Sequence, residues 1–130
     1  MSREIMAFCC EHSAYSAADL AGRLALHCPE NLRVIPVPCA GRVDTLHILK
    51  AFEKGAAAVL VLGCEEGACH HLTGNTRAKE RVKHSEILLK EIGGNGRYVA
   101  MSNLSPNAPH KFVEIVDEMN EKIKRSGEVR

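Results

Sequence analysis

The feature that most constrains the fold is a set of four short, continuous apolar runs along the chain. They cover residues 5–10, 32–39, 57–64 and 98–103. Each run is hydrophobic at nearly every position rather than at alternate positions, a pattern typical of strands covered on both faces in a parallel sheet. The segments between the runs are too long for hairpin turns, so neighbouring strands are expected to lie parallel.

Amphipathic stretches separate and follow these runs, and they predict four helices. The apolar or small residues at helical spacing are Ala17, Leu20, Ala21, Leu24 and Cys28 in the first, Leu46, Leu49 and Phe52 in the second, Ala78, Val82, Ser85, Leu89 and Ile92 in the third, and Phe112, Ile115, Val116, Met119 and Ile123 in the last. Pro29 is expected to stop the first helix, Asp44 to cap the second and Gly55 to follow its end. The third is expected to begin near residue 75, and Gly127 to end the last.

A strand followed by a helix, repeated four times, predicts an α/β fold. Right-handed crossovers place helices on both faces of the sheet, which gives a three-layer sandwich around a four-stranded parallel sheet. We expect the strand order 2-1-3-4. The chain has 130 residues and no internal repeats or low-complexity segments, so residues 1–130 are expected to form a single domain around one core.

Composition excludes several classes of function. The 17 Lys and Arg residues against 16 Asp and Glu leave a net charge of +1, which gives no reason to expect nucleic acid or membrane as a partner. No apolar run approaches the roughly 18 residues that span a bilayer. The amino terminus carries no signal-peptide hydrophobic region. A cytoplasmic protein is therefore expected, where clustered thiols indicate metal binding or redox chemistry rather than disulfides.

Most of the cysteines follow the carboxyl ends of the predicted strands, where ligands bind in open α/β sheets. Cys9 and Cys10 close the first run, while Cys39 and Cys64 close the second and third. Cys69 follows Cys64 in the next loop. Adjacent residues of a strand face opposite sides, so only one of Cys9 and Cys10 can face a shared site. Cys10 is preferred because it is closer to the loop, with Cys9 as the alternative.

The sixth cysteine belongs elsewhere. Cys28 lies before the second strand, at the opposite edge of the predicted sheet, and its helical register with Leu24 predicts a core residue. The remaining candidates are Cys10, Cys39, Cys64 and Cys69, and four thiolates are what a [2Fe–2S] cluster or a structural zinc site requires. Two other interpretations stay open. The thiols can be small buried residues that coincide at strand ends, and His12, His70 or His71 can replace one of them as a ligand.

With these residues in view, the chain resembles the delta subunit family of methyl-viologen-reducing hydrogenase. The segments that carry the resemblance are 7–10, 18–22, 39–44, 48–56, 63–70 and 74–82, in order and at fitting spacings. The resemblance implies a [2Fe–2S] centre that relays electrons from a hydrogenase or other dehydrogenase to the flavin of a heterodisulfide reductase-type subunit, feeding flavin-based electron bifurcation in anaerobes. In one place the chain departs from the family. The first motif usually reads Cys-Cys-x-x-Cys, and Ser13 stands at its third cysteine.

Three functions are compatible with these features. The first is an electron-transfer subunit of an oxidoreductase complex, carrying a [2Fe–2S] cluster and lacking a substrate site of its own. The second is a cluster-less or zinc-binding adaptor in the same complex. The third is a thiol or persulfide relay that uses Cys64 and Cys69.

An electron carrier must bring its cluster close to a second redox centre, so the cysteine edge is expected to be a docking face. Arg42, beside Cys39, is the first cation expected to surround that face. Arg77, Arg81 and Lys83 follow the Cys69 loop and are expected to border it from the other side. Charges at the rim of an interface mainly set the encounter rate and its salt dependence. Exchanging Arg77, Arg81 and Lys83 for Glu should therefore slow electron delivery to the partner most at low salt.

Overall fold

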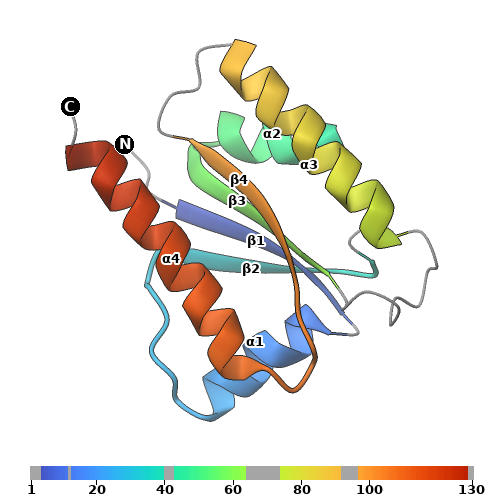
Figure 1. The fold of residues 1–130 in the computed structure, drawn as a ribbon. Coiled ribbons are helices and arrows are strands. Elements are labelled where there is room, and N and C mark those ends of the chain that lie inside the picture. Colours follow the sequence, from blue (N-terminus) through green and yellow to red (C-terminus); the bar gives the residue numbers. More distant parts are fainter. Residues whose placement is uncertain (1–3, 12, 40–42, 64–73, 92–96, 129–130) are drawn as a thin grey trace.

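The chain forms one parallel sheet covered by helices on both faces (Figure 1). The computed structural model describes residues 4–11, 13–39, 43–63, 74–91 and 97–128, with the backbone alone for 74–77 and 126–128. The strands are β1 (Glu4–Cys10), β2 (Leu32–Val37), β3 (Ala56–Gly63) and β4 (Tyr98–Asn103), and the helices are α1 (Ala14–Arg23), α2 (Thr45–Glu53), α3 (Gly74–Glu91) and α4 (Pro109–Glu128).

The strand pairing confirms the predicted topology. The sheet has the order β2-β1-β3-β4, and every pair of neighbouring strands is parallel. The two central strands, β1 and β3, are the most completely buried, as their continuous apolar sequences predict. All four strands therefore end at one edge of the sheet, which we call the carboxyl edge. Within the described residues, no helix is long and apolar enough to cross a membrane.

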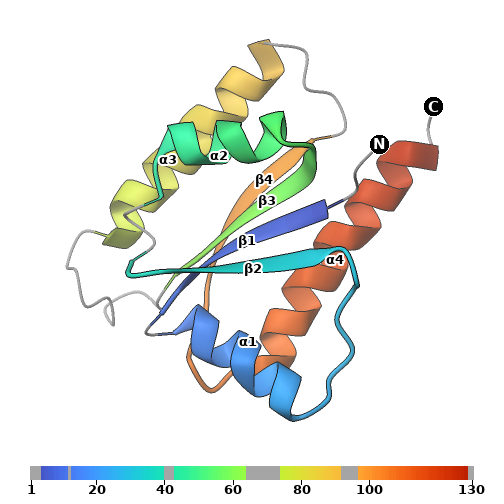
Figure 2. The same ribbon diagram turned by 180° about the vertical axis from the view of Figure 1, so that it is seen from behind.

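Each face of the sheet packs against its own pair of helices (Figures 1 and 2). On one face, α1 and α4 close a core that includes Ile5, Leu60, Phe112 and Val116. On the other face, α2 and α3 close a second core around residues such as Phe52 and Val59. The alternation of side chains along the strands assigns successive residues to the two cores. This is the expected three-layer sandwich.

The first helix ends earlier than its apolar spacing predicts. Helix α1 stops at Arg23, and Ala25 follows in the left-handed conformation with φ of 56°. The N–H of Leu26 donates to the carbonyl of Ala21 at 3.0 Å, and that of Ala25 donates to Gly22 at 3.1 Å. These paired bonds are those of a Schellman motif, which terminates a helix by satisfying its last carbonyls. Leu24 is consequently 53% exposed rather than buried, and Pro29 is not the stop.

The other helices follow the predicted faces with local exceptions. Gly55 has φ of 106°, the left-handed conformation that favours glycine after a helix end. In α2, the predicted core position Leu46 is 57% exposed, and Ile48 and Ala51 are buried instead. Helix α4 continues to Glu128, past the expected end at Gly127. The predicted core positions of α3 up to Leu89 are buried, while Ile92 lies outside the described residues.

Candidate metal centre at the carboxyl edge of the sheet

The structure places two of the predicted cysteines at the edge where β1 and β2 end. Cys10, the last residue of β1, pairs with Val37, the last residue of β2. The Cys10 thiol donates to the carbonyl of Pro38, with 3.9 Å between Sγ and the oxygen. Cys39 is the residue after that carbonyl, and both cysteine side chains are buried. Adjacent parallel strands that both end in a cysteine segment place the two thiols at the same edge.

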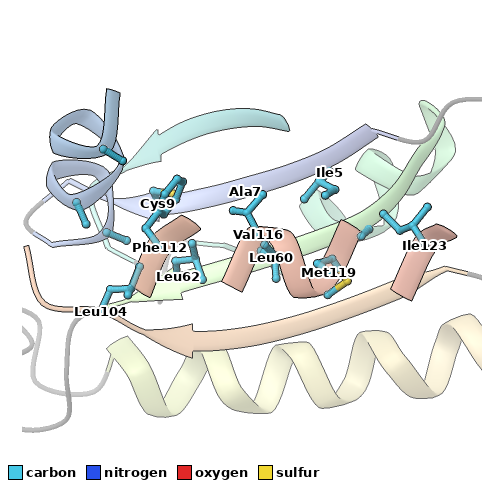
Figure 3. Packing of buried hydrophobic residues seen from close by; sticks show 14 residues of the cluster. Ile5, Ala7, Cys9, Leu60, Leu62, Leu104, Phe112, Val116, Met119 and Ile123 are labelled. Atoms are coloured by element: carbon cyan, nitrogen blue, oxygen red, sulfur yellow. The ribbon is translucent and has the colours of Figure 1, made fainter. Parts of the chain in front are cut away.

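The neighbouring thiol, that of Cys9, faces the opposite side of the sheet. Cys9 packs in the core closed by α1 and α4, together with Leu62 and Phe112 (Figure 3). Burial, with a smaller contribution from Cys10, raises the pKa of the Cys9 thiol to about 12. A thiol with such a pKa stays protonated at neutral pH, and the thiolate is the form that binds metals and reacts. In the structure, Cys9 contributes to the apolar core closed by α1 and α4.

Cys28 lies at the other edge of the sheet, away from Cys10 and Cys39. It precedes the amino end of β2 and packs, half-buried, against the α1/α4 core. Its predicted helical register with Leu24 is wrong, because α1 ends five residues before it at Arg23. Burial, followed by the negative charge of Asp117, raises the pKa of its thiol.

Ser13 occupies the turn that joins β1 to α1, close to Cys10. Its N–H donates to the Cys10 carbonyl at 3.2 Å, and its own carbonyl accepts from Ala17 at 3.0 Å. Ser13 is the N-cap residue of α1, yet its hydroxyl makes no capping hydrogen bond to the helix, and its side chain is buried. Ser13 thus lies one tight turn after Cys10.

Arg81 has a structural role that the sequence did not reveal. Its Nη1 donates to the carbonyl of Val43 at 3.2 Å. Val43 is buried and lies between Cys39 and α2, so the guanidinium fastens α3 to the segment that follows Cys39. The docking role of Arg81 stays a prediction beside this structural one, and Lys83 on the same helix is exposed. Arg42 and the Arg77 side chain lie outside the described residues.

The structure also identifies a residue that sequence reasoning missed. Asn103 is the last residue of β4, and its Oδ1 is buried without a hydrogen-bond partner among the described residues. A buried polar atom without a partner is rare in folded proteins, and it often marks a functional site. In the sequence, only the position of Asn103 pointed to this site: Asn103 closes the fourth apolar run and is therefore expected at the same edge of the sheet as Cys10.

The chemistry of these residues suits a metal–sulfur group. Cys10 and Cys39 supply two thiols at one edge, and Asn103 supplies an unsatisfied amide at the same edge. Cys64, Cys69, His12, His70 and His71 lie outside the described residues. Within the described part of the chain, no three His, Cys, Asp or Glu side chains are close enough together to hold a metal ion. A complete ligand set would therefore need side chains beyond Cys10 and Cys39.

Comparisons with known proteins identify relatives that are named as iron–sulfur subunits. The chain is 41% identical over 127 residues to the iron–sulfur subunit of the vhu F420-non-reducing hydrogenase of Methanocaldococcus jannaschii, covering 98% of this chain and 95% of that one. It is 43% identical to the protein of the same name in Methanococcus maripaludis, over 95% and 92% of the two chains. One subunit of the ferredoxin:CoB–CoM heterodisulfide reductase of Methanosarcina mazei is 32% identical over 96% of this chain but only 16% of its own length. The family described as methyl-viologen-reducing hydrogenase, delta subunit, matches residues 5–127, and the chain belongs to that family.

Proposed function

We propose that residues 1–130 form a single iron–sulfur domain that carries electrons within a hydrogenase-type complex. The group is a [2Fe–2S] cluster held at the carboxyl edge by Cys10, Cys39, Cys64 and Cys69. When bound, such a cluster supplies a one-electron carrier whose potential depends on charge, hydrogen bonds to sulfur and exposure. Reduced thiols are required as ligands, which places the protein in the cytoplasm.

The observation that carries the proposal is the contact between Cys10 and the Pro38 carbonyl. The contact joins Cys10 to the residue before Cys39, while the sequence-adjacent Cys9 lies in the apolar core on the other face. Alternation along the strand separates the two side chains, and it leaves Cys10, at the strand end, at the same edge as Cys39. Both hydrogenase relatives named above are called iron–sulfur subunits, which supports the metal assignment.

The residues around the two thiols prepare the edge for an electron carrier rather than for a substrate. Both thiols are buried, so the surrounding protein keeps water away from the sulfur atoms. Arg81 fixes the segment after Cys39 to α3, and the Ser13 turn fixes the chain after Cys10. Fixed ligands with a dry environment limit the rearrangement that accompanies a change of charge.

The partners follow from the relatives. The hydrogenase iron–sulfur subunits are separate chains of about this length, whereas in the Methanosarcina mazei heterodisulfide reductase a similar segment is part of a much longer chain. A domain that is fused in one protein works at a high effective concentration beside the rest of it. We therefore assign this chain a heterodisulfide reductase-type flavoprotein as electron acceptor, and a hydrogenase or other dehydrogenase as donor.

The test uses single Cys→Ala variants of the full chain, purified without oxygen and analysed for iron and acid-labile sulfide. The variants C10A, C39A, C64A and C69A should lose most of the iron and the visible absorbance of the cluster. The variants C9A and C28A are matched controls, since they remove the same atom elsewhere, and they should keep both. Iron loss in C9A with retention in C10A would overturn the ligand assignment, and an iron-free wild-type protein would overturn the proposed function.

One observation favours a second candidate, a cluster-less or zinc-binding adaptor in the same complex. Ser13 stands where the family has a cysteine, and its side chain is buried beside the Cys10 turn. A serine hydroxyl has a high pKa and is a poorer metal ligand than a thiolate. Metal analysis separates the two functions, because the adaptor would hold zinc or no metal while still binding its partner. The variant S13C should then gain iron that the wild-type protein lacks.

A further inference from the structure

The unsatisfied amide of Asn103 needs a physical explanation. Its Oδ1 lies buried at the carboxyl end of β4 with no hydrogen-bond partner among the described residues. Leaving a buried acceptor unpaired costs roughly 1–3 kcal/mol of folding stability. The backbone next to it is satisfied, because the N–H of Leu104 donates to the Gly63 carbonyl at 2.8 Å. The cost therefore belongs to the side chain, where a ligand could remove it.

Asn103 and Cys10 face the same side of the sheet. Val99 and Met101 of β4 pack in the core closed by α2 and α3, so Asn103, two residues further, lies on that face as well. Met6 and Phe8 of β1 pack in the same core. Cys10 therefore also lies on the α2/α3 face, at the end of β1.

The two side chains also lie in one row across the sheet. Cys9 pairs with Leu62 of β3, and Gly63 pairs with Asn103. Extending the first register by one residue places Gly63 between Cys10 and Asn103. Gly63 has no side chain, so no side chain of β3 stands between the thiol and the amide. Two strand spacings separate them, which is roughly 9–10 Å between backbones. That separation is too long for a direct hydrogen bond and leaves room for a group between them.

We propose that Asn103 is a positioning residue of the iron–sulfur group, and that its amide donates a hydrogen bond to sulfur there. This inference rests on the proposed function. Half a turn about χ2 exchanges the oxygen and the nitrogen of a carboxamide, which have nearly the same size. In the metal-free chain the oxygen has no partner among the described residues, and after the half turn the N–H suits sulfur as an acceptor when the group is bound. A hydrogen bond to sulfur stabilises the reduced, more negative form and raises the reduction potential.

The test compares the midpoint potentials of the loaded wild-type protein and the variants N103L, N103D and N120L. N103L keeps the size of Asn103 but removes the donor, so it should lower the midpoint potential. The expected change is about tenfold in the ratio of reduced to oxidised cluster at a fixed potential, equivalent to about 59 mV for a one-electron couple. N103D replaces the donor with a negative acceptor and should lower the potential further. Asn120, whose side chain accepts from Asn31 at 3.1 Å at the opposite edge, provides the control. N120L should keep the wild-type potential.

A second measurement separates positioning from a purely structural role. Metal-free N103L should be at least as stable to urea as the metal-free wild-type protein, because it removes an unpaired buried polar atom. A large loss of stability in N103L, beyond that in N120L, would show that Asn103 is structural and would overturn the inference. If N103L does not fold, the midpoint potential of loaded N103D is compared with that of the wild-type protein instead.

The two proposals fail in different ways. An unchanged midpoint potential in a loaded Asn103 variant would overturn the role of Asn103 and leave the electron-transfer function standing. A wild-type protein without iron would overturn both.

Discussion

The two faces of the sheet differ in what they do with the residues at its carboxyl edge. On the α1/α4 face, Cys9 lies in a closed apolar core and its thiol has a pKa of about 12. On the α2/α3 face, the corresponding edge holds the Cys10 thiol, the Arg81 contact and the unpaired Asn103 amide. At the carboxyl edge, the α1/α4 face is therefore an apolar core, whereas the α2/α3 face carries polar groups that an apolar core would exclude.

This difference shows how a strand can assign different roles to two identical neighbours. Cys9 and Cys10 are adjacent in sequence and have the same chemistry, and only the alternation of the strand separates their environments. On the α1/α4 face, burial of Cys9 contributes to folding stability and keeps its thiol unreactive. On the α2/α3 face, the Cys10 thiol and the Asn103 amide could bind a ligand, and the unpaired amide oxygen lowers folding stability. The proposed function therefore depends on register, since a shift of one residue would exchange the two cysteines.

The largest expected effect is on the apolar face. Phe112 is almost completely buried in the α1/α4 core, so Phe112→Ala should lower the free energy of unfolding by about 3–5 kcal/mol. Urea denaturation of the metal-free protein measures this change. The variant C10A, on the other face at the same edge, should cost only about 1 kcal/mol, the value for one small buried group. Equal losses in the two variants would contradict the division of the faces.

A second expected effect concerns pH. The folded chain holds the Cys9 proton up to about pH 12, whereas the unfolded chain releases it near the ordinary thiol value of 9.0. Because the folded form binds the proton more tightly, this contribution to stability is fully present below pH 9 and is lost as the pH rises through 12. The loss should reach up to about 4 kcal/mol.

The measurement is the pH dependence of urea unfolding for the wild-type protein and for Cys9→Ala, between about pH 8 and the highest pH at which both fold. Lysines and tyrosines titrate equally in the two proteins, so the difference between the curves reports Cys9. The wild-type protein should lose stability more steeply than the variant. Parallel curves would mean that Cys9 is not enclosed in the core, and the contrast with Cys10 would fail.

Sequence patterns predicted the layers and the strand order 2-1-3-4, because long-range order in such a fold follows from continuous apolar runs and crossover rules. Local ends were less predictable. Apolar spacing continues past Arg23 and predicts a helix as far as Cys28, yet the Schellman bonds at Ala25 stop the helix first. Leu46 fits the helical period of α2 but lies in its first turn, beyond the edge of the core.

The candidate site was predictable to the extent that it depends on strand ends. Cys10 ends β1 and Cys39 follows the adjacent β2, and the rule that parallel strands end at one edge was enough to place both cysteines at that edge. The structural role of Arg81 depends on its hydrogen bond to the Val43 carbonyl. The role proposed for Asn103 depends on a side-chain oxygen that has no hydrogen-bond partner among the described residues. Neither leaves a pattern in the sequence, since an arginine on a helix resembles a solvated cation and an asparagine at a strand end resembles a turn residue.

A third expected effect tests how firmly the polar face is held. Arg81→Met keeps much of the apolar stem but removes the donor to the Val43 carbonyl, and should cost about 1–2 kcal/mol in urea unfolding. Lys83→Met is the matched control, because Lys83 is exposed on the same helix, and it should change stability by less than about 0.5 kcal/mol. Amide hydrogen exchange between Val43 and Ile48 should accelerate only in the first variant. Equal exchange in both would show that the Arg81 contact does not hold this segment.

The smallest expected effect concerns docking at the polar edge. Helix α3 follows the carboxyl end of β3 and runs back along the sheet, so its middle, with Lys83, lies nearer the carboxyl edge than its last turn (Figure 1). Lys83 and Lys90 are both exposed on α3. They are seven residues apart, which places them on nearly the same side of the helix about 10 Å from each other. The pair therefore tests position along α3 with the same chemical change.

If the flavoprotein partner docks at the carboxyl edge, Lys83→Glu should slow electron delivery a few-fold at low salt, because rim charges act mainly on the encounter rate. Lys90→Glu should have a smaller effect, and both effects should shrink as ionic strength rises and screens the charges. Stopped-flow reduction of the partner at two salt concentrations measures the rates. Equal slowing by the two variants would indicate a general attraction between net charges. An effect confined to Lys90→Glu would place the docking face at the opposite edge, away from Cys10 and Cys39, and would separate the electron path from the thiols.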